Sequence, residues 1–354
     1  MRDLVLYGSY GYTGRLIAEA AVDRGFDPLL AGRERRSLES QAARLGTEFE
    51  VVGLDEPKVL DMVLEEAAVV LNCAGPFSRT WEPMVDACLR TGTHYLDITG
   101  ELSVFEAIHE RSGAAAAEDV MVLPGTGFDV VPTDCLAAHL ADRLPDADRL
   151  ELAFRAEGGV SRGTAKTMLE HIDSGGAVRR DGAIEAVPLG RESRTVAFGW
   201  GVDPAYATAI GWGDVSTAYH TTGIPNVTVY AAMPESAARL QRLAGVLSPL
   251  LGMDPVTRAL QWYVERTTDG PDAAARERGR SYVWGEVTTP DGERAVARLR
   301  GPHAYALTVE TALACAQRTL DGDVEPGFQT PAGVYGPDLI LDVEGVERED
   351  ATVQ

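Results

Sequence analysis

The sequence predicts an α/β protein with an N-terminal doubly wound parallel sheet and a second α+β domain that contains a mixed or antiparallel sheet. Three observations predict this fold. A glycine-rich turn joins the first apolar run to a helix, short apolar strands alternate with helical stretches up to about residue 130, and longer strands and hairpins follow Pro132. We expect domains over residues 1–132 and 133–302, and helices over 303–354 that return to the first domain.

Six short apolar segments are the predicted strands of the first domain, and small or polar residues follow each of them. The strands are Leu4–Tyr7, Pro28–Ala31, Phe49–Val52, Ala68–Cys73, His94–Leu96 and Val120–Leu123. Ligands of a doubly wound sheet bind outside the carboxyl ends of its strands. We therefore expect the binding site at this edge.

The turn after the first strand has glycines at the spacing G-x-x-G-x-x-G. Glycine permits a tight turn and close backbone approach, and the following helix directs free N–H groups at a phosphate. A tight connection without a ligand is the alternative. We expect a dinucleotide to contact the whole turn: Gly8, Ser9, Tyr10, Gly11, Tyr12, Thr13 and Gly14.

Arg33 stands where the second strand ends, with Arg35 and Arg36 close behind. An acidic residue at this place selects NAD by accepting a hydrogen bond from the ribose 2′-hydroxyl, whereas a guanidinium suits a 2′-phosphate. The sequence therefore predicts NADP rather than NAD. Ordinary surface arginines are the alternative.

Three further segments supply candidate site residues. The segment Ala74, Gly75, Pro76 and Phe77 is the predicted clamp along the cofactor, and Gly127 with Phe128 follows the sixth strand. Asp129 is the first candidate for an orienting or proton-handling group. Asp97 and Glu101 form a second pair of candidate catalytic carboxylates. The alternative is that both side chains accept hydrogen bonds from nearby loop N–H groups and have no role in the chemistry.

The second domain begins near Thr133 and contains a predicted hairpin, Tyr282–Thr288 with Ala295–Arg300. Its residues 240–263 are rich in apolar side chains, which suit a buried core, a dimer face, or a surface that contacts a lipid-like substrate or the periphery of a membrane. Tyr206 and Tyr305 are further candidate acids. A Schiff-base lysine could only be Lys166, because the one other lysine, Lys58, begins a peripheral helix.

Composition excludes several classes of protein. The formal net charge is −22, which argues against a nucleic-acid partner and predicts a halophilic protein, with an ordinary acidic protein as the alternative. No apolar run reaches the ~20 residues that a membrane span needs. The first residues form a strand rather than a signal peptide, so we expect a cytoplasmic protein. The 4 cysteines and 6 histidines lack metal-site spacing, and we expect no metal.

Five ordered motifs resemble the saccharopine dehydrogenase-like oxidoreductases, and most closely their trans-acting enoyl reductase branch. They are Gly8–Gly14, Ala31–Arg33, Leu71–Phe77, Tyr95–Glu101 and Gly127–Asp134. The resemblance implies a Rossmann domain for NADP, a second domain over the nicotinamide, and a homodimer that pairs through the second sheet.

Hydride transfer to a polarised C=C bond of a small or lipid-like substrate is the function that this resemblance favours. A C=N or amino-acid dehydrogenase is one alternative, and arginines would then have to bind substrate carboxylates. The candidates for that role are Arg162, Arg179, Arg180 and Arg300. A catalytically silent NADP sensor is the other alternative.

Overall fold

The computed structural model describes residues 2–159, 161, 176–188, 190–233 and 270–353. Arg162, Lys166 and the apolar segment 240–263 lie outside the described residues. The chain divides into two compact units. The first unit contains residues 1–131 and 307–335, and the second contains 132–306 and 336–354.

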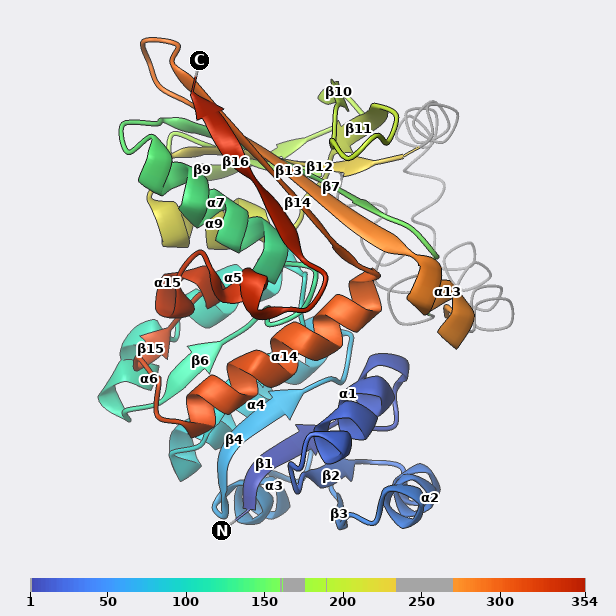
Figure 1. Ribbon diagram of the computed structural model, residues 1–354. Helices are drawn as coiled ribbons and strands as arrows, with labels where there is room; N and C mark the ends of the chain where they lie inside the picture. The colour runs from blue at the N-terminus through green and yellow to red at the C-terminus, as the bar shows by residue number, and fades with distance from the viewer. Residues whose placement is uncertain (1, 160, 162–175, 189, 234–269, 354) are drawn as a thin grey trace. The chain divides into compact units, whose positions relative to one another are not determined.

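A seven-stranded parallel sheet forms the first unit, in the order β15-β6-β5-β4-β1-β2-β3 (Figure 1). The doubly wound sheet predicted from the sequence is confirmed, and each predicted strand is present. The strands are β1 Arg2–Tyr7, β2 Leu29–Gly32, β3 Phe49–Val51, β4 Ala67–Asn72, β5 His94–Asp97, β6 Met121–Leu123 and β15 Gly327–Phe328.

The strand order reverses beside β1, which pairs with β2 on one side and with β4 on the other. Tyr7 is in register with both Ala31 and Asn72, so the carboxyl ends of the three strands meet at one edge. A reversal of strand order is where doubly wound sheets bind ligands. The glycine-rich turn follows β1 at this place.

Helices cover both faces of the parallel sheet, as right-handed crossovers between parallel strands require. Figure 1 shows α1 and α14 in front of the strands. The helices are α1 Tyr12–Asp23, α2 Arg35–Leu45, α3 Pro57–Leu64, α4 Phe77–Thr91, α5 Leu102–His109, α6 Ser112–Ala117, α14 Ala304–Leu320 and α15 Pro331–Tyr335.

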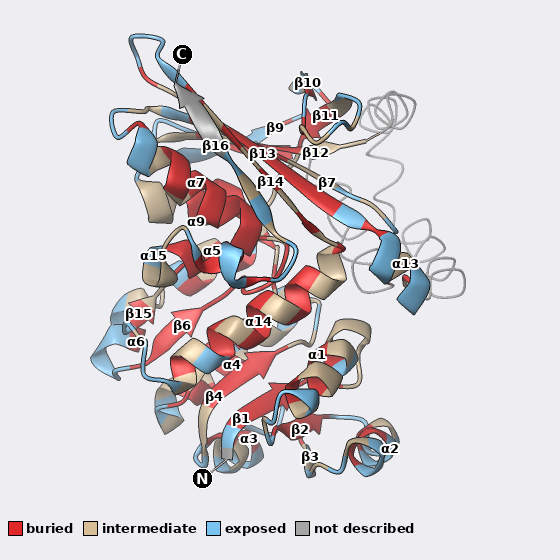
Figure 2. Ribbon diagram, in the orientation of Figure 1, coloured by how far each residue is buried: buried red, intermediate tan, exposed pale blue. Residues whose placement is uncertain are grey.

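The core of the first unit lies between the sheet and helices α3 to α6. Leu60 of α3, Met84 of α4 and Ile108 of α5 pack on side chains of the strands, among them Val70 and Tyr95. Figure 2 shows β1, β4 and β6 as buried. The strands read as continuous apolar runs because a parallel sheet is covered on both faces.

A nine-stranded mixed sheet forms the second unit, as the sequence predicts for this region. Its main path is β10-β11-β12-β7-β13-β14-β16, with β8 joined to β12 and to β9. The strands are β7 Arg149–Ala156, β8 Gly176–Arg180, β9 Ala183–Val187, β10 Ser193–Val196, β11 Ala205–Ala209, β12 Asn226–Ala232, β13 Arg280–Thr288, β14 Arg294–Pro302 and β16 Glu347–Val353.

The predicted hairpin is β13 paired antiparallel with β14, and it includes the turn at Gly292. Helix α7, Val131–Arg143, packs on β13: a Cβ added to Gly285 would lie 2.7 Å from a methyl group of Leu140. Helix α9, Asp214–Thr222, packs on β12. The remaining elements are the helix α13, Ala273–Arg278, and the 3₁₀ turn η1, Leu339–Asp342.

The C-terminal segment is organised differently from the sequence expectation. Residues 307–335 belong to the first unit, as expected for returning helices, but residues 336–354 belong to the second. Their strand β16 pairs antiparallel with β14 at the edge of the sheet. The segment Glu347–Asp350 is entirely polar, so no apolar alternation marked it as a strand.

Within the part of the chain that the structure describes, no helix has both the length and the apolar composition needed to cross a membrane.

Candidate functional site

The glycine-rich turn brings the backbone of three segments into close contact. The Gly8 N–H donates to the Ala31 carbonyl at 2.8 Å, and the Gly11 N–H donates to the Gly8 carbonyl at 3.1 Å. A Cβ added to Gly8 would lie 2.8 Å from the Ala74 Cβ, and Gly8 also has a φ of +76°. The position of Gly8 therefore accepts no residue other than glycine.

Helix α1 begins directly at this turn, because Gly11 is its N-cap residue. No side chain caps the helix and its first turn contains no acidic residue. The first N–H groups of a helix have no partner within the helix, and they carry its positive partial charge. A Cβ on Gly14 would lie 2.5 Å from the Gly8 carbonyl oxygen, so glycine also brings the helix close to the turn. This arrangement is suited to a diphosphate.

The end of β2 provides the cationic part of the site. Arg33, Arg35 and Arg36 are exposed, and no ion pair is recorded for them with the described residues. Burial raises the pKa of the Tyr7 hydroxyl to about 12, and the nearby Arg33 charge opposes that increase. Arg33 therefore lies near the carboxyl ends of β1 and β2. The Tyr10 ring packs against Gly32, where an added Cβ would lie 2.7 Å from the ring.

The predicted clamp, residues 74–77, is held by Asn72 at the end of β4, Thr80 of helix α4 and Glu101 in the segment after β5. The Asn72 amide oxygen accepts from the Ala74 N–H at 3.0 Å, and the Thr80 hydroxyl donates to the Ala74 carbonyl at 2.7 Å. Glu101 accepts hydrogen bonds from the N–H groups of Phe77 at 2.7 Å and Ser78 at 3.0 Å.

Glu101 is thus the cap of helix α4. The residue is only 5% exposed, and its carboxylate lies at the positive end of that helix. These bonds are the loop N–H contacts that the sequence offered as the alternative to a catalytic role for Glu101.

Asp97 has partners at both of its carboxylate oxygens. One oxygen accepts from the N–H groups of Thr99 at 2.9 Å and Gly125 at 2.8 Å, and the other accepts from the Tyr95 hydroxyl at 2.7 Å. Asp97 is fully buried. Burial raises its pKa to about 6, against the lowering effect of these three bonds. Its bonds connect β5 with the segment that follows β6.

Asp129 lies in the segment that follows β6, within the first unit. Burial raises the pKa of its carboxyl to about 7. The carboxyl packs against Gly100: an added Cβ there would lie 2.9 Å from the Asp129 Cβ and 3.0 Å from its Oδ2. The structure therefore brings Asp97, Glu101 and Asp129 into one loop cluster, with a different environment for each carboxylate.

Helix α14 supports the same segment through two threonines that the sequence did not identify. The Thr308 hydroxyl accepts from the Phe128 N–H at 3.0 Å, and the Thr311 hydroxyl donates to the Thr126 carbonyl at 2.7 Å. A Cβ on Gly127 would lie 3.0 Å from the Thr308 methyl group. Threonine within an apolar helix is an ordinary core residue, so no local signal distinguished the two.

The other sequence candidates have partners within the second unit. Arg179 donates to the carbonyls of Val215 and Gly182, each at 2.8 Å. Arg180 pairs with Glu185 and Glu192, and Arg300 with Glu347. The Tyr305 hydroxyl accepts from the Ser161 N–H at 2.6 Å. Tyr206 is partly buried on β11.

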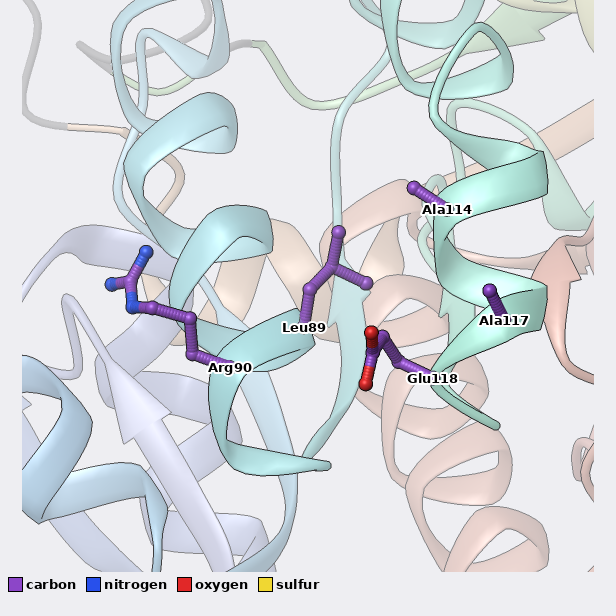
Figure 3. A pocket seen from close by; sticks show the side chains of 5 residues that line it. All are labelled: Leu89, Arg90, Ala114, Ala117 and Glu118. Atoms are coloured by element: carbon purple, nitrogen blue, oxygen red, sulfur yellow. The ribbon is translucent and has the colours of Figure 1, made fainter.

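A pocket of about 540 Å³ lies elsewhere in the first unit, between the end of α4 and α6 (Figure 3). It is lined by Leu89, Arg90, Ala114, Ala117 and Glu118. Leu89 is 12 residues beyond the start of α4 at Phe77, or about 18 Å along the helix axis. This pocket is therefore not the nucleotide site.

Removal of the Tyr95 hydroxyl should destabilise the protein more at pH 8 than at pH 5. The pKa of Asp97 is raised to about 6, so its ionised form is present at pH 8 and its neutral form at pH 5. Tyr95→Phe should therefore cost about 1.5–3 kcal/mol of unfolding free energy at pH 8, where the bond is charge-assisted, and about 0.5–1.5 at pH 5. Urea unfolding at both pH values measures this difference, and equal losses would contradict it.

Comparisons with known proteins identify an NADP-binding domain in the first part of the chain. Residues 4–123 match the family model of the saccharopine dehydrogenase NADP binding domain. A Mycobacterium leprae trans-acting enoyl reductase is 38% identical over 150 residues, which are 40% of this chain and 36% of that protein. A Mycobacterium tuberculosis protein whose name places it among the trans-acting enoyl reductases is 28% identical, and the alignment covers 96% of this chain and 94% of that protein.

Two further likenesses extend the comparison. The human saccharopine dehydrogenase-like oxidoreductase is 34% identical over 40% of this chain and 38% of its own length. The alignments with this protein and with the Mycobacterium leprae protein thus span little more than a third of those proteins. The fold resembles that of the apo saccharopine dehydrogenase (L-Glu forming) of Saccharomyces cerevisiae, with a TM-score of 0.67, 12% identity and coverage of 99% and 100% of the two chains.

The parallel sheet, the glycine turn and the matching domain model define an NADP-binding oxidoreductase with a Rossmann domain. Within this class, residues 4–123 match the NADP binding domain of saccharopine dehydrogenase, and the chain is similar to the saccharopine dehydrogenase-like oxidoreductases. The family resemblance and the NADP cofactor expected from the sequence are confirmed.

Proposed function

We propose that this protein transfers hydride from NADPH to a polarised C=C bond, and that Asp129 supplies the proton for the adjacent carbon. The observation that carries the proposal is the Asp129 carboxyl, whose pKa of about 7 suits a general acid near neutral pH. It belongs to the same unit and the same sheet edge as the glycine turn and the clamp.

The described residues fit the cofactor at each of its parts. The turn Gly8–Gly14 has the close approaches and the free helix end that a diphosphate needs, and Arg33 supplies charge for a 2′-phosphate. The segment Ala74–Phe77 would lie along the nicotinamide half. When bound, the nicotinamide supplies the hydride.

The three carboxylates have different roles in this proposal. Glu101 holds the first turn of α4 and Asp97 holds the segment after β6, since both accept hydrogen bonds from backbone N–H groups. Asp129 is the proton donor of this proposal, because burial raises the pKa of its carboxyl to about 7. Gly100 permits the close packing that fixes this carboxyl, because any side chain there would displace it.

An enoyl substrate, small or lipid-like, is favoured by the names of the mycobacterial relatives. A saccharopine-type reaction would instead need arginines that are available to bind two carboxylates. Arg179, Arg180 and Arg300 each have partners within the second unit, which disfavours this role for them. The homodimer, the cytoplasmic location, the peripheral membrane contact and the halophilic character stay predictions.

The loss of NADPH absorbance at 340 nm in the presence of candidate acceptors tests the proposal. We expect oxidation with 2-enoyl thioesters and none with 2-oxo acids plus an amino acid. Oxidation with only the second pair would support an amino-acid dehydrogenase. Binding of NADPH without oxidation by either acceptor class would support an NADP sensor.

Arg33→Ala should weaken NADPH binding about tenfold and leave NADH binding nearly unchanged, because a hydrogen bond to a charged group contributes about 1.5 kcal/mol or more. The neighbouring Arg35 and Arg36 would retain part of the attraction. Calorimetric titration with both nucleotides measures the effect. An equal loss for NADPH and NADH would show that Arg33 does not read the 2′-phosphate.

A further inference from the structure

Gln41 and Ser9 form a buried, reciprocal pair of hydrogen bonds. The Ser9 hydroxyl donates to the Gln41 Oε1 at 3.0 Å, and the Gln41 Nε2 donates to the Ser9 carbonyl at 3.0 Å. Ser9 is 0% exposed and Gln41 is 6% exposed. The Ser9 side chain is therefore directed at helix α2, and its contribution to cofactor binding would be made through the backbone of the turn.

Helix α2 has few other attachments to the protein. Of its 11 residues only Leu38, Gln41 and Ala42 are buried. Arg44 of α2 also forms an ion pair with Glu19 of α1 at 2.7 Å, but both side chains are exposed, and such pairs contribute little to stability. A leucine and an alanine provide only a small apolar contact area. The hydrogen bonds of Gln41 thus form a substantial part of the attachment.

The amino end of α2 also carries an unfavourable arrangement of charge. Arg35 and Arg36 occupy its first turn and Arg33 precedes it. Glu34, the N-cap residue, is the one acidic side chain among them, and it accepts a hydrogen bond from the Ser37 hydroxyl at 2.9 Å. Cations at the positive end of a helix are destabilising and repel one another. Glu34 offsets one of these three positive charges, and a bound anion would offset more of them. Without a bound anion, contacts further along the helix must hold the arginines.

We propose that Gln41 is a positioning residue for cofactor choice, which fixes the arginine-bearing helix α2 relative to the diphosphate-binding turn. This inference rests on the NADP site described above. The distance between the diphosphate and the 2′-phosphate of one NADP molecule is set by covalent bonds. A direct link between the two protein segments that receive these groups keeps them at a matching distance.

Gln41→Leu removes both bonds at similar volume and tests the inference. The turn itself keeps its backbone bonds from Gly8 to Ala31 and from Gly11 to Gly8. We therefore expect the dissociation constant for NADPH to rise about 30-fold and that for NADH about threefold or less, so that the preference for NADPH falls about tenfold. Ser9→Ala, which keeps the bond to the Ser9 carbonyl, should lower the preference less.

Two controls separate positioning from general destabilisation. Gln317→Leu makes the same substitution on α14, where the exposed Gln317 side chain donates to the exposed side chain of Asp321, and it should leave both constants unchanged. Arg33→Ala combined with Gln41→Leu should bind NADPH about as weakly as Gln41→Leu alone, because both changes remove the same contact with the 2′-phosphate. Additive losses would mean that Gln41 acts independently of Arg33.

The outcomes distinguish this inference from the proposed function. A wild-type protein without preference for NADPH would overturn the assignment of Arg33 and this inference together. A wild-type preference that Gln41→Leu keeps, or equal weakening of NADPH and NADH in this variant, would overturn the inference alone. Amide hydrogen exchange over Arg35–Leu45 gives a check that needs no cofactor: Gln41→Leu should accelerate exchange in α2, and unchanged exchange would contradict the positioning role.

Discussion

Asp129→Asn should lower the rate of NADPH oxidation about 10²- to 10⁴-fold, because a positioned general acid contributes a factor of this size. Binding of NADPH should remain within about twofold of the wild type, since no part of the predicted nucleotide contacts involves this carboxyl. Single-turnover kinetics with saturating NADPH and an enoyl thioester, together with calorimetry, separate the two effects.

The pH dependence follows from the raised pKa of Asp129. Its protonated form is the proton donor, and the pKa of about 7 keeps that form present up to neutral pH. The wild-type rate should therefore be level below pH 6 and fall as the pH rises through 7. The residual rate of Asp129→Asn should lack this decrease.

Asp291→Asn is the matched control. Asp291 is exposed in the turn between β13 and β14, and the same substitution there should change neither the rate nor its pH dependence. An Asp129→Asn variant with wild-type turnover would exclude Asp129 as the acid.

Gly14→Ala should weaken NADPH binding by about 100-fold or more, which corresponds to about 2.7 kcal/mol. The added methyl group would lie 2.5 Å from the Gly8 carbonyl oxygen and 3.0 Å from the Ser9 Cα. Both contacts are with backbone, so helix α1 and the turn have to separate. The N–H groups that would receive the diphosphate then no longer converge.

Variants at two other glycines provide NADPH affinities with which that of Gly14→Ala can be compared. A Cβ on Gly11 would lie 3.3 Å from the Gly8 carbonyl oxygen, so Gly11→Ala should weaken binding less than Gly14→Ala. Gly113→Ala adds a methyl group in α6 with nothing within 4 Å and should have no effect. Thermal unfolding of each variant shows that it is folded. Wild-type affinity in folded Gly14→Ala would contradict the role of this turn.

The parallel sheet was predictable because both of its faces are covered. Continuous apolar runs such as Leu4–Tyr7 and Ala68–Cys73 are visible in the sequence, and the glycine spacing marks the turn without further information. A helix was also expected at the start of the segment 303–354, and it is present as α14, Ala304–Leu320. The strand Glu347–Val353 was missed because it is a polar edge strand whose partner is distant in the sequence.

The supporting residues of the site could not be predicted, since they act through contacts between distant segments. Thr308 is 180 residues from Phe128, and Gln41 is 32 residues from Ser9. Glutamine and threonine are common on helices, so their residue type carries no signal of these bonds. For Glu101, the sequence left two interpretations open, a catalytic role or hydrogen bonds to loop N–H groups. In the structure its carboxylate accepts from the N–H groups of Phe77 and Ser78.

The fate of deuterium from [4-²H]NADPH tests the central claim most directly. The protein is incubated with each C4 epimer of the labelled cofactor and a 2-enoyl thioester, and the product is analysed by mass spectrometry. We expect one epimer to give a saturated thioester with one deuterium at the β-carbon and a solvent proton at the α-carbon. Unlabelled and unreduced thioester recovered from a protein that binds NADPH would contradict hydride transfer to C=C.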